Sequence, residues 1–178
     1  MSKYFYFAAD CPLESASAGE QTFPPAIRIF SDPPHAEILG NREWYVIQSR
    51  ESVWEHDSIH TTLTHMAAAD WDILSEEHGW QIIEYLRRHL ELTEEIEIWS
   101  LFLDMEEYTH KWYNIPIDEL TPEDLRILWN RKDIFGGFID RHSAKPVLPT
   151  QHCLIVTREP YVWNSVRMKN WRDLYPAP

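Results

Sequence analysis

The order of hydrophobic and polar positions in this chain predicts several short strands. Runs of apolar and aromatic residues bounded by polar or Pro-containing segments predict strands at 4–8, 27–30, 44–47, 95–102 and 152–157. The run at 95–102 starts with strict alternation and then becomes wholly apolar, which is typical of a central strand with one partly exposed end. Residues 11–25 are rich in Ser, Ala and Pro, and they predict a loop.

Two helices are indicated by capping residues followed by apolar positions at helical spacing. Ser75 is a capping residue for a helix that ends near Leu90, with apolar positions at Ile82, Ile83, Leu86 and Leu90. In a second helix, Thr121 is the cap and Pro122 occupies the first helical position. This helix is predicted to reach about Asn130 and to bury Leu125, Leu128 and Trp129.

One stretch carries mixed signals. Within 51–69, Thr61, Thr62 and Thr64 favour a strand or an exposed turn, whereas residues 66–69 favour a helix. Strands that alternate irregularly with two or three helices predict an α+β fold with a mostly antiparallel sheet. The 178 residues fit a single domain, on which we expect the basic, aromatic segment 158–178 to pack.

The charge of the chain is concentrated in its middle. Residues 51–124 hold 19 Asp and Glu against three Lys and Arg, whereas the whole chain has a net charge of −13. Such a surplus speeds the capture of a cationic partner and has the wrong sign for binding phosphates. We therefore predict a basic protein as partner, with neither nucleic acid nor a membrane surface involved.

Motifs for known chemistry are missing from the sequence. It contains no P-loop, no Gly-x-Gly-x-x-Gly and no Gly-x-Ser-x-Gly, so we predict no cofactor and no catalytic residue. Cys11 and Cys153 are far apart and form no metal pattern, which indicates two reduced thiols. The first apolar run is too short for a signal peptide, and no stretch would span a bilayer, so a cytoplasmic location is expected.

A histidine cluster is the sharpest alternative to a binding function. His56 and His60 are four residues apart and would share one face of a helix, with His65 nearby and Glu55 or Asp57 as a further ligand. A metal-dependent hydrolase would use this set. The competing interpretation is a solvated loop that happens to contain histidines.

Two other constellations have a chemical and a structural interpretation. The carboxylates at Asp104, Glu106, Glu107 and Asp118 suit paired acid and base work, although a dense acidic surface produces such pairs by chance. The C-terminal segment interleaves Arg158, Arg167, Lys169 and Arg172 with Trp163 and Trp171, as a surface for single-stranded nucleic acid does. We favour an internal role for these bases, in which they fold back onto the acidic middle.

Aromatic residues inside the acidic segment indicate how a basic protein would be bound. Five tryptophans lie there, at 54, 71, 80, 99 and 112, and any that remain at the surface would anchor a partner that the carboxylates attract. An ordinary acidic protein with tryptophan in its core is the alternative. The predicted partner-binding residues are Asp70, Asp72, Glu76, Glu77, Asp104, Glu106, Glu107 and Trp112.

Overall character links the chain to one known class. The opening Tyr4-Phe5-Tyr6-Phe7-Ala8 and the segment 115–125 look like features of small bacterial families, and the acidic, apparently non-catalytic chain resembles bacterial immunity proteins. These proteins neutralise nuclease toxins, including those of contact-dependent growth inhibition systems. The resemblance implies stoichiometric inhibition, in which the acidic face occupies the nucleic-acid groove of a toxin. An intracellular regulatory or scaffolding domain remains a further alternative.

Overall fold

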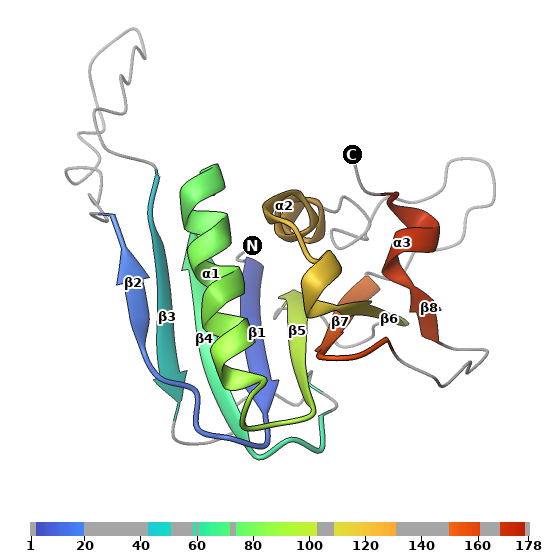
Figure 1. Ribbon diagram of the computed structural model, residues 1–178, viewed down its shortest axis with the longest axis horizontal. Helices are drawn as coiled ribbons and strands as arrows, with labels where there is room; N and C mark the ends of the chain where they lie inside the picture. The colour runs from blue at the N-terminus through green and yellow to red at the C-terminus, as the bar shows by residue number, and fades with distance from the viewer. Residues whose placement is uncertain are drawn as a thin grey trace, which may run out of the picture.

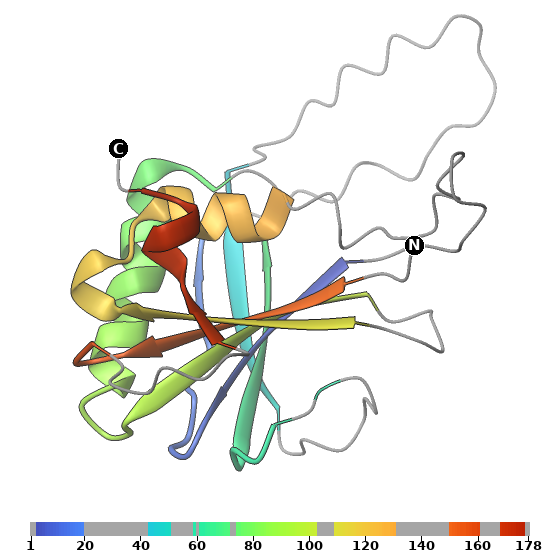
Figure 2. The ribbon, with the colours of Figure 1, turned by 90° about the vertical axis from the view of Figure 1, so that its right-hand side faces the viewer.

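The computed structural model of the protein describes residues 3–19, 43–50, 59, 61–71, 74–102, 109–130, 150–160 and 168–176. Within this part of the chain, eight strands form one sheet, and the helices lie on one face of it (Figures 1 and 2). The strands are β1 (Lys3–Ala9), β2 (Ala16–Ala18), β3 (Tyr45–Arg50), β4 (His65–Trp71), β5 (Glu95–Phe102), β6 (Thr109–Pro116), β7 (Thr150–Thr157) and β8 (Met168–Asn170). The helices are α1 (Glu76–His89), the short 3₁₀ helix η2 (Ile117–Glu119), α2 (Pro122–Asn130) and α3 (Trp171–Leu174).

The sheet is antiparallel except at one end. Its strand order is β2-β3-β4-β1-β5-β7-β6-β8, and the pairs β6–β7 and β6–β8 are parallel. The prediction of an α+β fold with a mostly antiparallel sheet is confirmed. None of the helices among the described residues is both long and apolar enough to cross a membrane.

Most predicted elements are present at or near their predicted bounds. The strands expected at 4–8, 44–47, 95–102 and 152–157 are β1, β3, β5 and β7, and the two capped helices are α1 and α2. The strand expected at 27–30 lies outside the described residues.

Five elements differ from the predictions. Residues 66–69 form part of strand β4, so the helical preference of this stretch is wrong. The loop predicted at 11–25 contains the short strand β2. Strands β6 and β8 and helix α3 were not predicted. The Ala-rich stretch of β4 is a strand because it pairs on both sides, with β1 and β3, and this tertiary pairing outweighs helix propensity.

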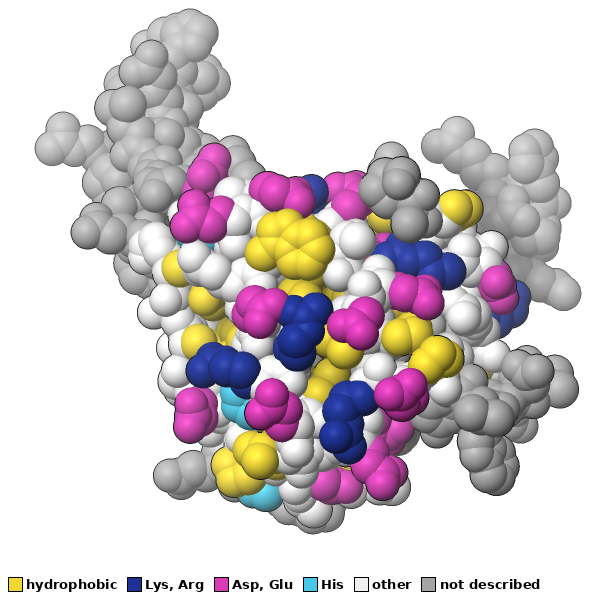
Figure 3. Space-filling view, viewed as in Figure 1, with side chains coloured by type: hydrophobic (Ala, Val, Ile, Leu, Met, Phe, Trp, Pro, Cys, Tyr) yellow, Lys and Arg dark blue, Asp and Glu magenta, His cyan; other side chains and the backbone are white. Residues whose placement is uncertain are grey.

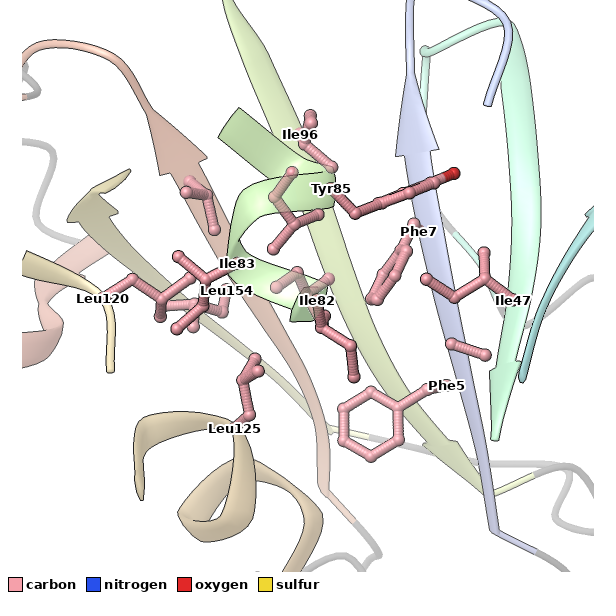
Figure 4. Packing of buried hydrophobic residues seen from close by; sticks show 14 of the residues in the cluster. Phe5, Phe7, Ile47, Ile82, Ile83, Tyr85, Ile96, Leu120, Leu125 and Leu154 are labelled. Atoms are coloured by element: carbon pink, nitrogen blue, oxygen red, sulfur yellow. The ribbon is translucent and has the colours of Figure 1, made fainter. Parts of the chain in front are cut away.

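The main hydrophobic core lies between the sheet and the helices. Phe5 and Phe7 of β1 face this side and pack in one cluster with Ile82 and Ile83 of α1 and Leu125 of α2, and all five are fully buried (Figure 4). The ring of Phe5 stacks on the rings of Trp71 and Trp129, with centroids 4.8 and 4.9 Å apart.

A second, smaller hydrophobic cluster lies on the opposite face of the sheet. Because successive side chains of a strand point to opposite faces, the strand residues next to those of the main core point to this face. Trp99 and Leu101 of β5 are buried in this cluster, together with Tyr6, Ala8, Leu63, Met66, Cys153 and Ile155. The central strands are therefore buried on both faces, which explains the continuous apolar runs in β5 and β7.

Local interactions fix where α1 and α2 begin. The Ser75 hydroxyl oxygen accepts a hydrogen bond from the His78 backbone N–H at 3.2 Å, which confirms Ser75 as the cap of α1. In α2, the Asp124 carboxylate accepts from the backbone N–H and the hydroxyl of Thr121 at 2.8 and 2.7 Å. Thr121 thus donates its hydroxyl instead of accepting, and Asp124 takes the role of the acidic residue in a capping box.

The two helices approach each other closely at one glycine. A Cβ atom placed on Gly79 of α1 would lie 2.4 Å from Cβ of Pro122 at the start of α2. Gly79 is buried, so the missing side chain allows the two helices to touch. This contact fixes the first turns of α1 and α2 next to each other, with their acidic residues on the outside.

Candidate functional site

The structure divides the predicted partner-binding residues between two faces of the sheet. Glu76 and Glu77 lie exposed in the first turn of α1, on the helix-covered face. Asp70 of β4 is exposed and alternates with the core residues, so it points to the opposite face. Trp112 of β6 is half-buried in the cluster on that face, where it meets Trp99 edge to face with centroids 4.9 Å apart. Asp72, Asp104, Glu106 and Glu107 lie outside the described residues.

The tryptophans of the acidic segment have distinct roles. Trp71 and Trp99 are buried in the two hydrophobic clusters, and Trp112 is half-buried. Trp80 of α1 is 44% exposed, and its indole N–H donates to the Glu76 carboxylate at 3.0 Å. Position 54 lies outside the described residues. Of the four described, Trp80 is therefore the one that offers a large aromatic surface to a partner.

Acidic side chains surround Trp80 on the helix-covered surface. We call the exposed acidic residues of α1, η2 and α2, together with Trp80, the acidic helix face; its members are Glu76, Glu77, Trp80, Glu84, Asp118, Glu119 and Glu123. Figure 3 shows this surface, with carboxylates spread around an exposed hydrophobic area beside α1 and α2. Negative charge gathers here because α1 and α2 both place acids in their first turns, which also suits the helix dipole.

Arginines from the helices cross-link part of the acidic helix face. Arg126 of α2 binds Glu76 at 3.0 Å and Glu123 at 2.8 Å, and its Nε donates to the Leu74 carbonyl at 2.9 Å. Arg87 of α1 pairs with Glu84 and lies 3.6 Å from Asp118. Exposed pairs of this kind are weak, so they hold the carboxylates in place without preventing another cation from binding them.

Part of the basic, aromatic C-terminal segment makes contacts inside the protein. Trp171 is fully buried, and its indole N–H donates to Asp124 at 2.8 Å. The neighbouring Arg172 binds the same carboxylate. Trp171 and Arg172 are therefore not available to stack on or bind a nucleic-acid strand. Arg167 and Trp163 lie outside the described residues.

A metal site is not visible in the part of the chain that the structure describes. Within it, no group of three or more His, Cys, Asp or Glu side chains could hold a metal ion. His65 lies in strand β4, half-buried, with its Nδ1 3.0 Å from the Thr64 hydroxyl. His56 and His60 lie outside the described residues, as do Glu55 and Asp57. Asp118, the described member of the predicted carboxylate pairs, has a side chain that is 82% exposed.

A buried carboxylate on the opposite face was not predicted from the sequence. Glu97 of β5 is 6% exposed, and its carboxylate accepts a hydrogen bond from the Trp99 indole at 2.7 Å. Burial raises the pKa of Glu97, while hydrogen bonds from Thr61 and Trp99 lower it. The same burial, with Glu97 nearby, holds the pKa of the Cys153 thiol well above its usual value. The strict alternation at 95–98 places Glu97 on a defined face, but only the second cluster shows that this face is covered.

Comparison with known proteins gives no match to a family model, to a curated protein or to a solved structure.

Proposed function

We propose that this protein binds and neutralises a basic partner protein, and that it acts as an immunity protein against a nuclease toxin. The proposal rests on one observation above all: Trp80 is 44% exposed and hydrogen-bonded to Glu76 within a surface of carboxylates. Glu76 and Glu77 were candidates from sequence, and Trp80 lies one helical turn from both.

The two kinds of side chain contribute differently to binding. Tryptophan is the residue type most often found at the energetic centre of protein interfaces, because it buries a large rigid surface. The carboxylates around it attract a cationic protein over a distance and orient it before contact. The bond from Trp80 to Glu76 holds the indole in one orientation, which lowers the entropy lost when a partner binds.

Inhibition would follow from competition with the nucleic acid. The carboxylates of the acidic helix face would take the place of phosphates in the basic groove of the toxin, and Trp80 would insert between its side chains. The weak pairs of Arg87 and Arg126 would exchange for contacts with the partner. Association would be fast at low ionic strength and would slow steeply as salt is added.

The test begins with the identity of the partner. The untagged protein is used to capture binders from native lysate at low salt, and these are eluted by rising salt and identified by mass spectrometry. A single basic nuclease near equal stoichiometry is expected. Its nuclease activity is then titrated with the purified protein, and full inhibition at one equivalent is expected.

Variants then locate the binding surface. Trp80→Ala, and Glu76→Gln with Glu77→Gln, should each weaken the complex by at least ~10-fold, as expected for interface hot spots. Glu159→Gln removes an exposed carboxylate outside the acidic helix face and should leave affinity unchanged. If the Trp80 and Glu76/Glu77 variants bind as tightly as the wild type, the interface lies outside the acidic helix face. A basic partner without nuclease activity would favour a regulatory or scaffolding role instead.

A further inference from the structure

One carboxylate beside Trp80 has no cation of its own. Glu77 lies three residues before Trp80 in α1, so the two side chains are neighbours on the helix surface. Glu77 is exposed, and its carboxylate accepts one hydrogen bond, from the side-chain amide of Gln81 at 3.4 Å. Within the part of the chain that the structure describes, no lysine or arginine pairs with Glu77. The negative charge of Glu77 is therefore open to a cation from outside the protein.

The other carboxylate one turn before Trp80 is already bound on both oxygens. Oε1 of Glu76 accepts from the Trp80 indole at 3.0 Å, and Oε2 lies 3.0 Å from a guanidinium nitrogen of Arg126. Glu76 is thus held by an arginine of the protein itself, and it holds the indole in turn. A cation that arrives at Trp80 reaches Glu77 without displacing this arginine.

A partner that covers Trp80 also removes water from Glu77, because the two side chains are one helical turn apart. An apolar side chain placed on the indole would leave the carboxylate of Glu77 without water and without a counter-charge, which is costly. A lysine would supply the charge, but its ammonium group is compact and strongly hydrated. The planar guanidinium of arginine can stack on the indole while its N–H groups donate to the carboxylate.

We propose that the partner presents an arginine at this point, which stacks on Trp80 and binds the carboxylate of Glu77. The inference rests on the proposed function, since it names the side chain with which a basic partner meets the acidic helix face. On the other side of Trp80 along α1, Glu84 is already paired with Arg87, so the guanidinium is expected on the side of Glu77. An arginine that binds phosphate in a nuclease offers the same N–H donors, so its capture would remove a phosphate contact.

Two peptides of equal charge test the preference for arginine. Hexa-arginine and hexa-lysine, each with blocked ends, are titrated into the protein at low salt. Binding is followed by NMR through the backbone amides of α1, and the Trp80 indole N–H, assigned with Trp80→Phe, reports contact with the ring. Hexa-arginine should bind at least ~3-fold more tightly than hexa-lysine, because only the guanidinium combines stacking with a paired contact.

Variants separate the contribution of the ring from that of the charge. Trp80→Leu keeps an exposed apolar side chain, and it should bring the two peptides to equal affinity because the cation–π contact is lost. Glu77→Gln should lower the affinity for hexa-arginine at least ~3-fold, since a charge-assisted contact is removed. Glu159→Gln makes the same change of charge at an exposed position outside the acidic helix face, and it should leave the preference for arginine unchanged.

The inference is overturned by any of four results. These are equal affinity of the two peptides for the wild type, a preference for arginine that persists in Trp80→Leu, normal binding by Glu77→Gln, and no shift of the Trp80 indole at millimolar peptide. The proposed function stands or falls separately. A nuclease inhibited through the acidic helix face, with equal binding of the peptides, would keep the immunity function and remove the arginine contact. A preference for arginine at Trp80, with no nuclease captured from lysate, would do the reverse.

Discussion

Arg172 donates one hydrogen bond to each carboxylate oxygen of Asp124, at 2.8 and 2.6 Å. The carboxylate is 2% exposed and also accepts from Trp171 and Thr121. A single side chain thus caps α2 and fastens α3 to it. Bidentate pairing of arginine with a carboxylate is the stronger and more specific form of such a contact. The C-terminal residues are therefore held to the domain by a buried polar network and by the packing of Trp171.

Removing the charge of Asp124 should destabilise the fold. Asp124→Asn keeps the size of the side chain but removes the bidentate carboxylate of Arg172 in a partly buried site, where the other carboxylate, that of Glu119, lies 4.0 Å away. We expect the free energy of unfolding to fall by about 3 kcal/mol in urea denaturation. As a control, Asp118→Asn removes a carboxylate that is 82% exposed and should change it by less than about 0.5 kcal/mol. Equal effects of the two substitutions would show that the network contributes little.

Gly79→Ala should destabilise the protein even though alanine favours helices. Helix propensity alone predicts a gain of about 1 kcal/mol. The added Cβ would lie 2.4 Å from Pro122, and we expect overpacking to reverse the sign and give a net loss of about 1–3 kcal/mol. The measurement is the free energy of unfolding. In a Pro122→Gly background the same substitution should cost much less, and additive effects in this cycle would rule out the steric explanation.

Stability should fall with rising pH because of Glu97. Burial raises the pKa of Glu97 in the folded protein, so the folded state holds its proton at a pH where the unfolded chain has released it. The destabilisation that ionised Glu97 causes is absent below the pKa of Glu97 in the unfolded chain. It is complete above the pKa of Glu97 in the folded protein. Glu97→Gln keeps an oxygen that accepts from Trp99 but cannot ionise. Urea unfolding from about pH 4 to 8 should show the variant gaining stability over the wild type, and a constant difference would contradict this.

Both cysteines should be unreactive in the folded protein. Burial raises the pKa of the Cys11 and Cys153 thiols, and Asp10 and Glu97 respectively act in the same direction. Thiols that are buried and protonated are poor nucleophiles. Reaction with a disulfide reagent near neutral pH should be at least ~100-fold slower than in denaturant, where both thiols react. A fast reaction of one thiol, assigned with Cys153→Ser, would reveal a reactive site.

Sequence predicted the elements whose signals are local. Ser75 and Thr121 mark the starts of α1 and α2 because a cap and an acidic first turn are read within a few residues. Strand β5 was also predicted, since its apolar run is continuous. Strand β6 was missed because Lys111 and Asn114 interrupt its pattern, and its strand state depends on pairing with β7 and β8.

The candidate site was harder to predict because exposure depends on tertiary packing. Glu76 and Glu77 were predicted and lie on the acidic helix face, but sequence could not show that Trp80, among several tryptophans, remains exposed. Asp70 belongs to the same acidic segment, yet the alternation of β4 directs it to the other side of the sheet. Glu97 is the opposite case. The sequence pattern of β5 does not show that its side chain is buried, because the second hydrophobic cluster that covers it forms only in the folded protein.

The strand order has a consequence for how the protein is made. β7 lies between β5 and β6 but follows both in the chain, and the two described neighbours of β6 are β7 and β8. A ribosome therefore releases β5 with one edge open and β6 with no partner from these strands, and both must wait for the C-terminal quarter of the protein. Open hydrophobic edges of this kind promote aggregation. Chains that stop before Thr150 should accumulate in inclusion bodies or bound to chaperones, even though they contain α1 and α2 in full.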